Sequence, residues 1–263
     1  RCLKEAEKED WAVCLDADDS LKPNALETIA AAFQREDCDM VFIGEDQVWQ
    51  DRVLRPFPVE MAFIGRVEEK RQLYKIVFQD GWYNPLWKKA VSVSLLPPEG
   101  VGEYYPVRFG EDLLQSIPMY EHCRRAVFLK DSLYNYTINP RSATNDLNYE
   151  KYRCSSLVPR TCWEFLKSQN VWTEADFGEY GNWLRRLTRF QVWLVAKFRT
   201  TAKNRSRLLE EIRRDEFYDM VISSAPGKDV VLHLMKGRHY RLLCLMGSCV
   251  RRLGDLRRWV KNG

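Results

Sequence analysis

Several common features are missing from this sequence. No stretch approaches the roughly 18 consecutive apolar residues that a membrane-spanning helix needs. The first residues, from Arg1 to Glu5, are charged and lack the apolar core of a signal peptide. No two cysteines have the Cys-x-x-Cys spacing of a zinc site, and the three histidines, His122, His233 and His239, show no ligand spacing. A membrane-spanning protein and a zinc protein are therefore both disfavoured.

The eight cysteines are scattered along the chain rather than clustered. An even number of cysteines can indicate disulfides, but a chain of 263 residues without a regular cysteine spacing is a poor candidate for a disulfide framework. We expect most of them to be buried thiols in a reducing compartment, which predicts a cytoplasmic protein.

The composition indicates a folded, globular chain whose charge is unevenly distributed. Hydrophobic residues make up 45% of the chain and charged residues 30%. Residues 1–150 carry 18 Lys and Arg against 26 Asp and Glu, a balance of −8. Residues 151–263 carry 23 against 11, a balance of +12. Such a split predicts two regions with different tasks, an acidic part that holds metal and substrate and a basic part that faces an anionic partner.

The pattern of apolar residues predicts an α/β domain over residues 1–150 and a basic helical region over residues 151–263. The first domain should begin with a strand at 11–15, a helix near 23–33 and a strand at 40–43, a βαβ unit with parallel strands. Further elements are expected in the following order: a strand at 47–54, a helix at 60–79, a helix at 110–123, and strands at 126–129 and 133–138.

The most informative stretch runs from Val13 to Ser20, where an apolar strand ends in three carboxylates, Asp16, Asp18 and Asp19. Ligands of open α/β sheets bind at such strand ends. Carboxylates crowded this closely repel one another unless a cation lies among them, and a divalent metal with oxygen ligands is the natural candidate. The alternative is that Asp19 or Ser20 caps the following helix and the other acids are solvated.

Four segments, taken together and in order, resemble the family 2 inverting glycosyltransferases of the GT-A fold, particularly bacterial enzymes that build capsule, exopolysaccharide or lipopolysaccharide glycans. These segments are Leu15-Asp16-Ala17-Asp18-Asp19, Leu86-Trp87-Lys88-Lys89, Gly110-Glu111-Asp112 and Leu133-Tyr134-Asn135-Tyr136 followed by Arg141-Ser142. The resemblance covers residues from about 10 to 145. It implies a partial GT-A (Rossmann-like) mixed sheet flanked by helices, followed by an all-helical C-terminal region.

The resemblance also implies roles for individual residues. Asp18, with Asp16, would hold Mg²⁺ or Mn²⁺ against the diphosphate of a nucleotide-sugar donor, with a UDP-sugar as the first expectation. Asp112 would be the general base that activates the acceptor, with Glu111 as second choice. Acidic residues in a first helical turn are also common for purely electrostatic reasons, which is the alternative for this pair.

Further binding residues are expected around these carboxylates, although ordinary roles are available to each of them. Trp82 and Trp87 could stack on a glycan or lipid-linked acceptor, or could be core aromatics. Lys88 could meet a phosphate, or could be a solvated surface residue. Arg141 and Ser142 could close over the donor diphosphate, or could form a cap.

The chain departs from the family pattern at its start. Family members place a nucleotide-binding half of about two βαβ-type units before the Asp-x-Asp strand, whereas about ten residues precede that strand here. We therefore expect that these 263 residues alone transfer no sugar.

The end of the chain is strongly basic, with eight Lys and Arg and one acid between Lys236 and Lys261. Apolar residues fall near one face of the predicted helix: Tyr240, Leu243, Gly247, Val250, Leu253 and Leu256. This pattern predicts a basic amphipathic helix on an anionic membrane surface, at the inner face of the plasma membrane, with a solvated helix packed on the protein as the alternative. Nucleic acid is not expected as a partner, because no recognised binding module accompanies the charge.

Two other functions fit parts of the sequence. A phosphohydrolase of the haloacid dehalogenase type would use Asp16 as nucleophile and Asp18 as acid/base. It leaves the Trp-Lys and Tyr-x-Tyr segments unexplained. A non-catalytic remnant that acts as an interaction scaffold is the second alternative.

Overall fold

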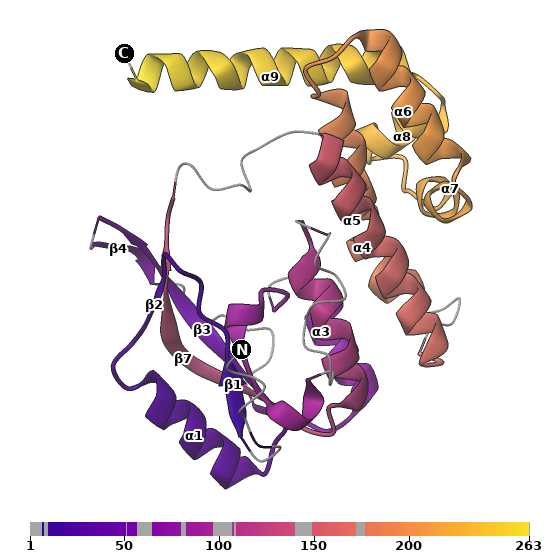
Figure 1. The fold of residues 1–263 in the computed structure, drawn as a ribbon. Coiled ribbons are helices and arrows are strands. Elements are labelled where there is room, and N and C mark those ends of the chain that lie inside the picture. The colour runs from indigo at the N-terminus through magenta and orange to yellow at the C-terminus, as the bar shows by residue number, and fades with distance from the viewer. Residues whose placement is uncertain are drawn as a thin grey trace. The chain divides into compact units, whose positions relative to one another are not determined.

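The computed structural model describes residues 7, 10–50, 52–56, 65–79, 83–96, 107, 109–139, 149–171 and 177–262, and every statement below concerns these residues. The chain divides into two compact units, residues 1–143 and 144–263. The sequence placed this division near residue 150. Each unit is described here by itself (Figure 1).

The N-terminal unit is built on a mixed sheet, in which seven strands are described. The central path of the sheet has the order β1-β6-β3-β7-β2, while β4 pairs with β3 and β5 with β7. The strands are β1 (Trp11–Val13), β2 (Ser20–Leu21), β3 (Met40–Trp49), β4 (Arg52–Pro56), β5 (Gly65–Val67), β6 (Lys89–Ser92) and β7 (Ala126–Thr137). The helices of this unit are α1 (Ala25–Glu36), α2 (Lys70–Gln79) and α3 (Glu111–His122), with short 3-10 turns η2 (Leu86–Lys88) and η3 (Val93–Leu95).

The predicted βαβ unit is present with one difference. Both β1 and β3 pair antiparallel with β6, so the two strands run in the same direction but β6 lies between them. The neighbour that is parallel to β3 is β7. The crossover helix α1 buries Ala25, Ile29 and Phe33. Leu26, which the sequence placed on the buried face, is 62% exposed, because the apolar stripe begins one residue earlier.

Two other expectations were wrong in detail. Residues 65–67 form strand β5 rather than the start of a helix, because Gly65 adopts a φ of 139° and the segment pairs with β7. The two strands expected at 126–129 and 133–138 are one continuous strand, β7. Its polar residues Lys130 and Asp131 interrupt the apolar pattern. The pairing of β7 with β3 resumes after them, at Ser132, with a shift in register.

Opposite faces of the sheet bury different side chains. Val41 and Ile43 of β3 belong to the core that α1 covers. Phe42 points to the other face, where it stacks on Phe128 with ring centroids 4.4 Å apart and meets Tyr120 of α3. This alternation along β3 follows from the two-residue period of a strand. Because β1 and β6 pair antiparallel, the carboxyl end of β1 and the amino end of β6 lie together at one edge.

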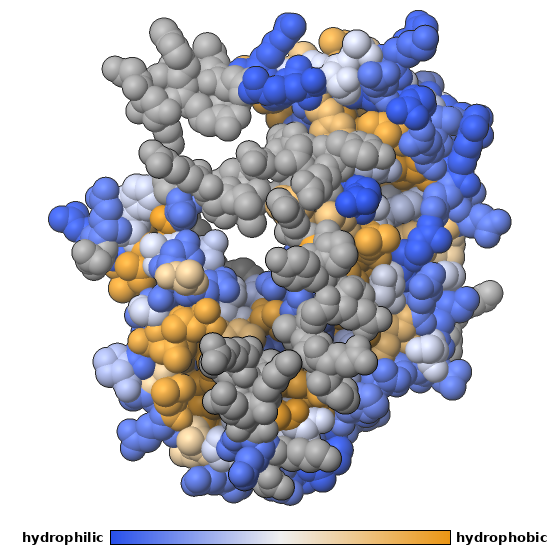
Figure 2. Space-filling view, in the orientation of Figure 1, coloured by the Kyte–Doolittle hydropathy of each residue, from blue (hydrophilic) through white to orange (hydrophobic). Residues whose placement is uncertain are grey.

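The C-terminal unit contains only helices among its described residues. They are α4 (Tyr149–Ser168), α5 (Phe177–Ala196), α6 (Ala202–Arg214), α7 (Glu216–Ser223), α8 (Val230–Lys236) and α9 (Tyr240–Asn262). In Figure 2 hydrophilic side chains dominate the surface of the helices labelled α6 and α7 in Figure 1, with apolar side chains visible between them. The fold class, a mixed sheet flanked by helices and followed by a helical region, is as predicted.

Part of the apolar face predicted for α9 packs inside its own unit. Leu243 is buried, and Gly247 lies so close to α5 that a Cβ there would be 2.2 Å from the carbonyl oxygen of Ala196. Leu242, Leu245 and Leu253 are exposed instead. None of the helices in the described part of the chain is long and apolar enough to cross a membrane.

Candidate functional site

The acidic stretch after β1 is a tight turn that one of its own carboxylates anchors. The Asp19 amide donates to the Asp16 carbonyl, which closes the turn. The Asp19 carboxylate accepts hydrogen bonds at 2.7 Å from the Tyr134 hydroxyl and from the Thr137 amide. The Tyr134 hydroxyl in turn accepts a hydrogen bond from the Asp16 amide at 3.1 Å. Asp19 is therefore occupied in holding the turn against β7.

This anchoring leaves Asp16 and Asp18 exposed at the edge of the sheet. Neither carboxylate has a hydrogen-bond or ion-pair partner within the described ranges. Partial removal from water raises the pKa of Asp16, and the charges of Asp112, Asp19 and Asp18 raise it further. The charge of Asp112, 96 residues later in the chain, is therefore felt by the Asp16 carboxyl.

The start of α3 brings Asp112 to this edge. Gly110 precedes the helix with a φ of 84°, a conformation that favours glycine, and Glu111 and Asp112 form the first turn. Burial raises the pKa of Asp112 to about 6, and the neighbouring charge of Glu111 adds to this effect. Lys89 and a hydrogen bond from the Leu86 backbone act in the opposite direction. Asp112 is therefore a partly buried carboxyl whose pKa is raised to about 6.

Lys89 is the cation buried beside Asp112. Its Nζ donates to the Ser116 hydroxyl at 2.8 Å and to the Asn84 carbonyl at 3.1 Å. Burial lowers the pKa of Lys89 to about 7, while the charge of Asp112 raises it. The two side chains thus stabilise one another's charged form inside the unit.

Lys88 and Trp87, both candidate substrate-binding residues, are buried in this structure. The Lys88 Nζ lies 2.7 Å from Oε2 of Glu45, and both side chains are less than a tenth exposed. Trp87 is 8% exposed and stacks on Tyr134 and Tyr136, with ring centroids 4.5 and 5.5 Å away. Both residues contact the strands that carry the site, and their roles toward a substrate stay predictions.

Three other candidates, Trp82, Arg141 and Ser142, lie outside the described residues. Within those residues, no group of three or more His, Cys, Asp or Glu side chains is arranged to hold a metal ion. The charge of Asp112 nevertheless acts on Asp16, so the first turn of α3 approaches the acidic turn from a distant segment of the chain.

No protein-family model and no curated protein matches the sequence. Solved structures do match. The fold is similar to that of S. aureus TarS. The structure of TarS residues 1–349 in complex with UDP has 18% sequence identity and a TM-score of 0.57, and the match covers 96% of this chain and 69% of that chain.

Two further TarS structures agree with this result. A second structure of TarS residues 1–349 matches with 16% identity and a TM-score of 0.56, over 96% of this chain and 69% of that chain. A third TarS structure matches with 16% identity and a TM-score of 0.51, over 92% of this chain and 41% of that chain. At these identities the matches show the fold alone, a partial GT-A-like α/β fold.

Sequence reasoning missed three residues that shape this site, Glu45, Lys89 and Tyr134. Glu45 carried a signal, because an acid two residues after the apolar run from Met40 to Ile43 is unusual in a buried strand. Lys89 carried none, since the pattern Lys88-Lys89 does not say which lysine turns inward. Tyr134 belonged to a recognised segment, but its hydrogen bonds to the acidic turn depend on the pairing of β2 with β7.

Proposed function

We propose that this protein is a glycosyltransferase that moves a sugar from a nucleotide-diphosphate donor to a glycan or lipid-linked acceptor. The observation that carries the proposal is that the partly buried Asp112 acts on the exposed Asp16, two residues before Asp18, in a GT-A-like fold. The UDP in the TarS complex supports a UDP-sugar as donor. Membership of family 2, inversion at the transferred carbon and a role in building a bacterial surface glycan are parts of the same proposal.

Mg²⁺ or Mn²⁺ fits the donor set at the acidic turn. Asp16 and Asp18 offer carboxylate oxygens, which these ions prefer, and both are exposed. The raised pKa of Asp16 reflects partial burial and crowding of negative charge, which a cation would relieve. Asp18 and Asp16 would hold the ion. When bound, it supplies a Lewis acid for the leaving diphosphate.

Asp112 is the proposed general base, and Glu111 is the second choice. A pKa of about 6 leaves Asp112 ionised at neutral pH while making it more basic than an ordinary aspartate. The hydrogen bond from the Leu86 backbone and the charge of Lys89 favour that ionised form. Because the base must be ionised to accept the acceptor's proton, we expect transfer to fall as the pH drops through about 6.

Contact with the acceptor is the least constrained part of the proposal. Trp82 and Trp87 are proposed to stack on it, and Lys88, Arg141 and Ser142 to contact phosphate groups.

We also propose that the protein is cytoplasmic and binds the inner face of the plasma membrane through residues 236–261. The exposed Leu242 and Leu245 beside Arg241 support this proposal. Flotation with anionic vesicles should be weakened by Leu245→Glu and unaffected by Leu26→Glu on α1.

The alternatives make different predictions. No observation favours a phosphohydrolase with Asp16 as nucleophile, and the likeness to TarS supports the transferase. A phosphatase assay with p-nitrophenyl phosphate tests this alternative, which requires activity that Asp16→Asn abolishes. A non-catalytic scaffold predicts no binding of a nucleotide sugar. The expectation that these 263 residues alone transfer no sugar stays a prediction that turnover assays check.

The experiment that tests the proposed function is calorimetric titration of the chain with UDP-sugars, with and without Mn²⁺. We expect binding that requires Mn²⁺ and is weakened about 100-fold or more by Asp18→Ala. Asp131→Asn is the matched control, because Asp131 is an exposed carboxylate of the same unit on β7. The absence of any binding, or equal losses in both variants, would count against the proposal.

A further inference from the structure

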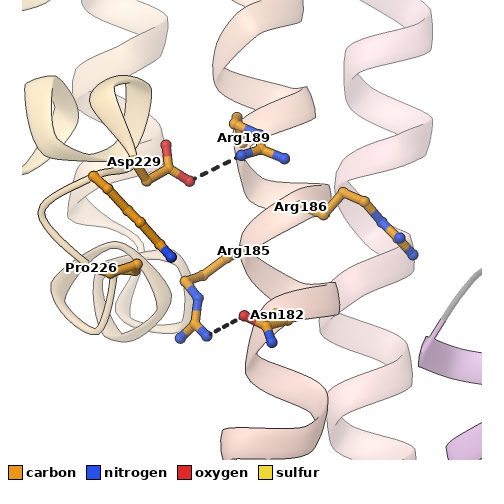
Figure 3. A pocket seen from close by; sticks show the side chains of 7 residues that line it. Asn182, Arg185, Arg186, Arg189, Pro226 and Asp229 are labelled. Carbon is orange, nitrogen blue, oxygen red and sulfur yellow. Dashed lines mark hydrogen bonds and ion pairs between the residues drawn. The ribbon is translucent and has the colours of Figure 1, made fainter.

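A second cluster of charge lies in the C-terminal unit, around a cavity of about 430 Å³. Arg185 and Arg189 of α5 are four residues apart, so they project from the same side of the helix. The loop between α7 and α8 faces them with Pro226, Lys228 and Asp229 (Figure 3). A cavity of this size is in the range of small-molecule sites.

The single acid at this cavity is already used within the protein. One carboxylate oxygen of Asp229 accepts a hydrogen bond from the Leu232 amide and so caps α8. The other oxygen lies 3.2 Å from the Arg189 guanidinium. Asp229 therefore pairs with Arg189. Arg185 and Lys228 bring further positive charge to the cavity.

The arginines are held in place rather than extended into solvent. The Arg185 guanidinium donates to the Asn182 side-chain oxygen at 2.8 Å and to the Ser224 hydroxyl at 3.5 Å. Figure 3 shows Arg185 and Arg189 bound to Asn182 and Asp229 in this way. A guanidinium whose orientation is fixed loses little entropy when it binds an oxyanion, and its planar donors match phosphate oxygens.

We propose that this cavity binds a phosphate monoester or phosphodiester group. Several cations around a concave site of this volume favour an anion with several charged oxygens over a single carboxylate. The lining residues all lie between Asn182 and Asp229, so the proposal is independent of the acidic edge and of the proposed transferase activity. The group belongs either to a free phosphate ester or to a lipid headgroup, and the experiment below separates these sources.

The test is calorimetry of the 263-residue chain in low-chloride buffer, with inorganic phosphate and glycerol 3-phosphate as probes. We expect a Kd of about 1 mM or tighter. Arg185→Gln combined with Arg189→Gln should weaken binding at least tenfold. Arg207→Gln is the control, since it removes an exposed positive charge from α6, which does not line the cavity.

A second pair of variants avoids the existing contacts. A Cβ at Gly227 would have no atom within 4 Å, so the site has room for a substitution, and Gly227→Glu introduces a carboxylate next to Lys228. It should weaken binding strongly, whereas Gly227→Ala should not. Binding of glycerol 3-phosphate in solution identifies a free ester as the source of the group. Binding only to phosphatidylglycerol vesicles, weakened by Gly227→Glu, identifies a lipid headgroup. Absence of binding to the soluble probes and to the vesicles, vesicle binding that Gly227→Glu leaves unchanged, or equal losses with Arg207→Gln would overturn the proposal.

Discussion

The two units of this protein use charged residues in opposite ways. In the N-terminal unit the ion pair between Lys88 and Glu45 is buried. Burial also raises the pKa of the partly buried Asp112 and lowers the pKa of the buried Lys89. In the helical unit, pairs such as Arg207 with Glu211 lie on the surface of one helix. The comparison teaches that burial, rather than the number of charges, marks the region suited to acid–base chemistry.

The largest expected difference between the units concerns their ion pairs. Lys88→Met removes the partner of Glu45 but keeps the apolar part of the side chain, so a buried carboxylate is left unpaired. We expect a loss of about 3–5 kcal/mol in the free energy of unfolding, measured by urea denaturation. Arg207→Met in the exposed pair should cost less than about 0.5 kcal/mol.

A different result would change the role of Lys88. If Lys88→Met left stability unchanged but weakened UDP binding, Lys88 would be a phosphate contact, as its neighbouring sequence first indicated. The ion pair between the Lys88 Nζ and Oε2 of Glu45, 2.7 Å apart, would then not be the main interaction of Lys88.

In the helical unit α5 and α9 pack closely, and the buried Arg205 donates to the Ala196 carbonyl and pairs with no acid among the described residues. Gly247→Ala would place a Cβ 2.2 Å from the Ala196 carbonyl oxygen, so α9 must move away from α5. We expect a destabilisation of about 1–3 kcal/mol, measured by thermal unfolding. Gly227→Ala, where the added Cβ meets nothing within 4 Å, serves as the control and should be near neutral. Equal stability of both variants would contradict the close contact.

A smaller effect is expected at the hydroxyl that holds the acidic turn. Tyr134→Phe removes one hydrogen bond to Asp19 and one from the Asp16 amide. We expect a loss of about 1–2 kcal/mol and weaker Mn²⁺-dependent UDP binding. Tyr240→Phe in the helical unit also removes a hydrogen bond to an acid, Glu210, and should leave UDP binding unchanged. If Tyr134→Phe and Tyr240→Phe had the same effect on UDP binding, the acidic turn would have no part in nucleotide binding.

The smallest effect follows from the raised pKa of Asp112. Because the folded protein holds this proton more tightly than the unfolded chain, the stabilisation is complete below pH 3.8 and is lost as the pH rises through about 6. Asp112→Asn should remove that loss, so its stability relative to the wild type increases between these pH values. Screening by water limits the change to about 1 kcal/mol. Parallel pH curves for the two proteins would contradict the raised pKa.

The sequence predicted the elements that local patterns determine. The strand before Asp16 and the helix after Gly110 both follow from periodicity and from residues that favour helix ends. The position of β6 between β1 and β3 could not be predicted in this way, because it depends on pairing between segments some 80 residues apart. The same holds for β5, which the local pattern assigned to a helix.

The sequence named candidate site residues but not the contacts that position them. Asp16, Asp18, Glu111 and Asp112 were chosen from short motifs, yet no local pattern says that a tyrosine on β7 holds the acidic turn. The adjacent Lys88 and Lys89, which the sequence does not distinguish, have different partners in the structure. Lys88 pairs with Glu45 and Lys89 faces Asp112, because consecutive side chains at the start of a strand point in opposite directions.

The most direct test of the account is to locate bound nucleotide in one unit or the other. Amide NMR signals would be recorded during titration with UDP and substoichiometric Mn²⁺, which broadens signals near the ion. The account predicts that the amides of residues 16–19 and 111–112 broaden first, and that Asp18→Asn removes this effect. Broadening centred instead on residues 182–189 and 226–229, with the acidic turn unaffected, would contradict it, because the diphosphate would then bind the basic cavity of the helical unit.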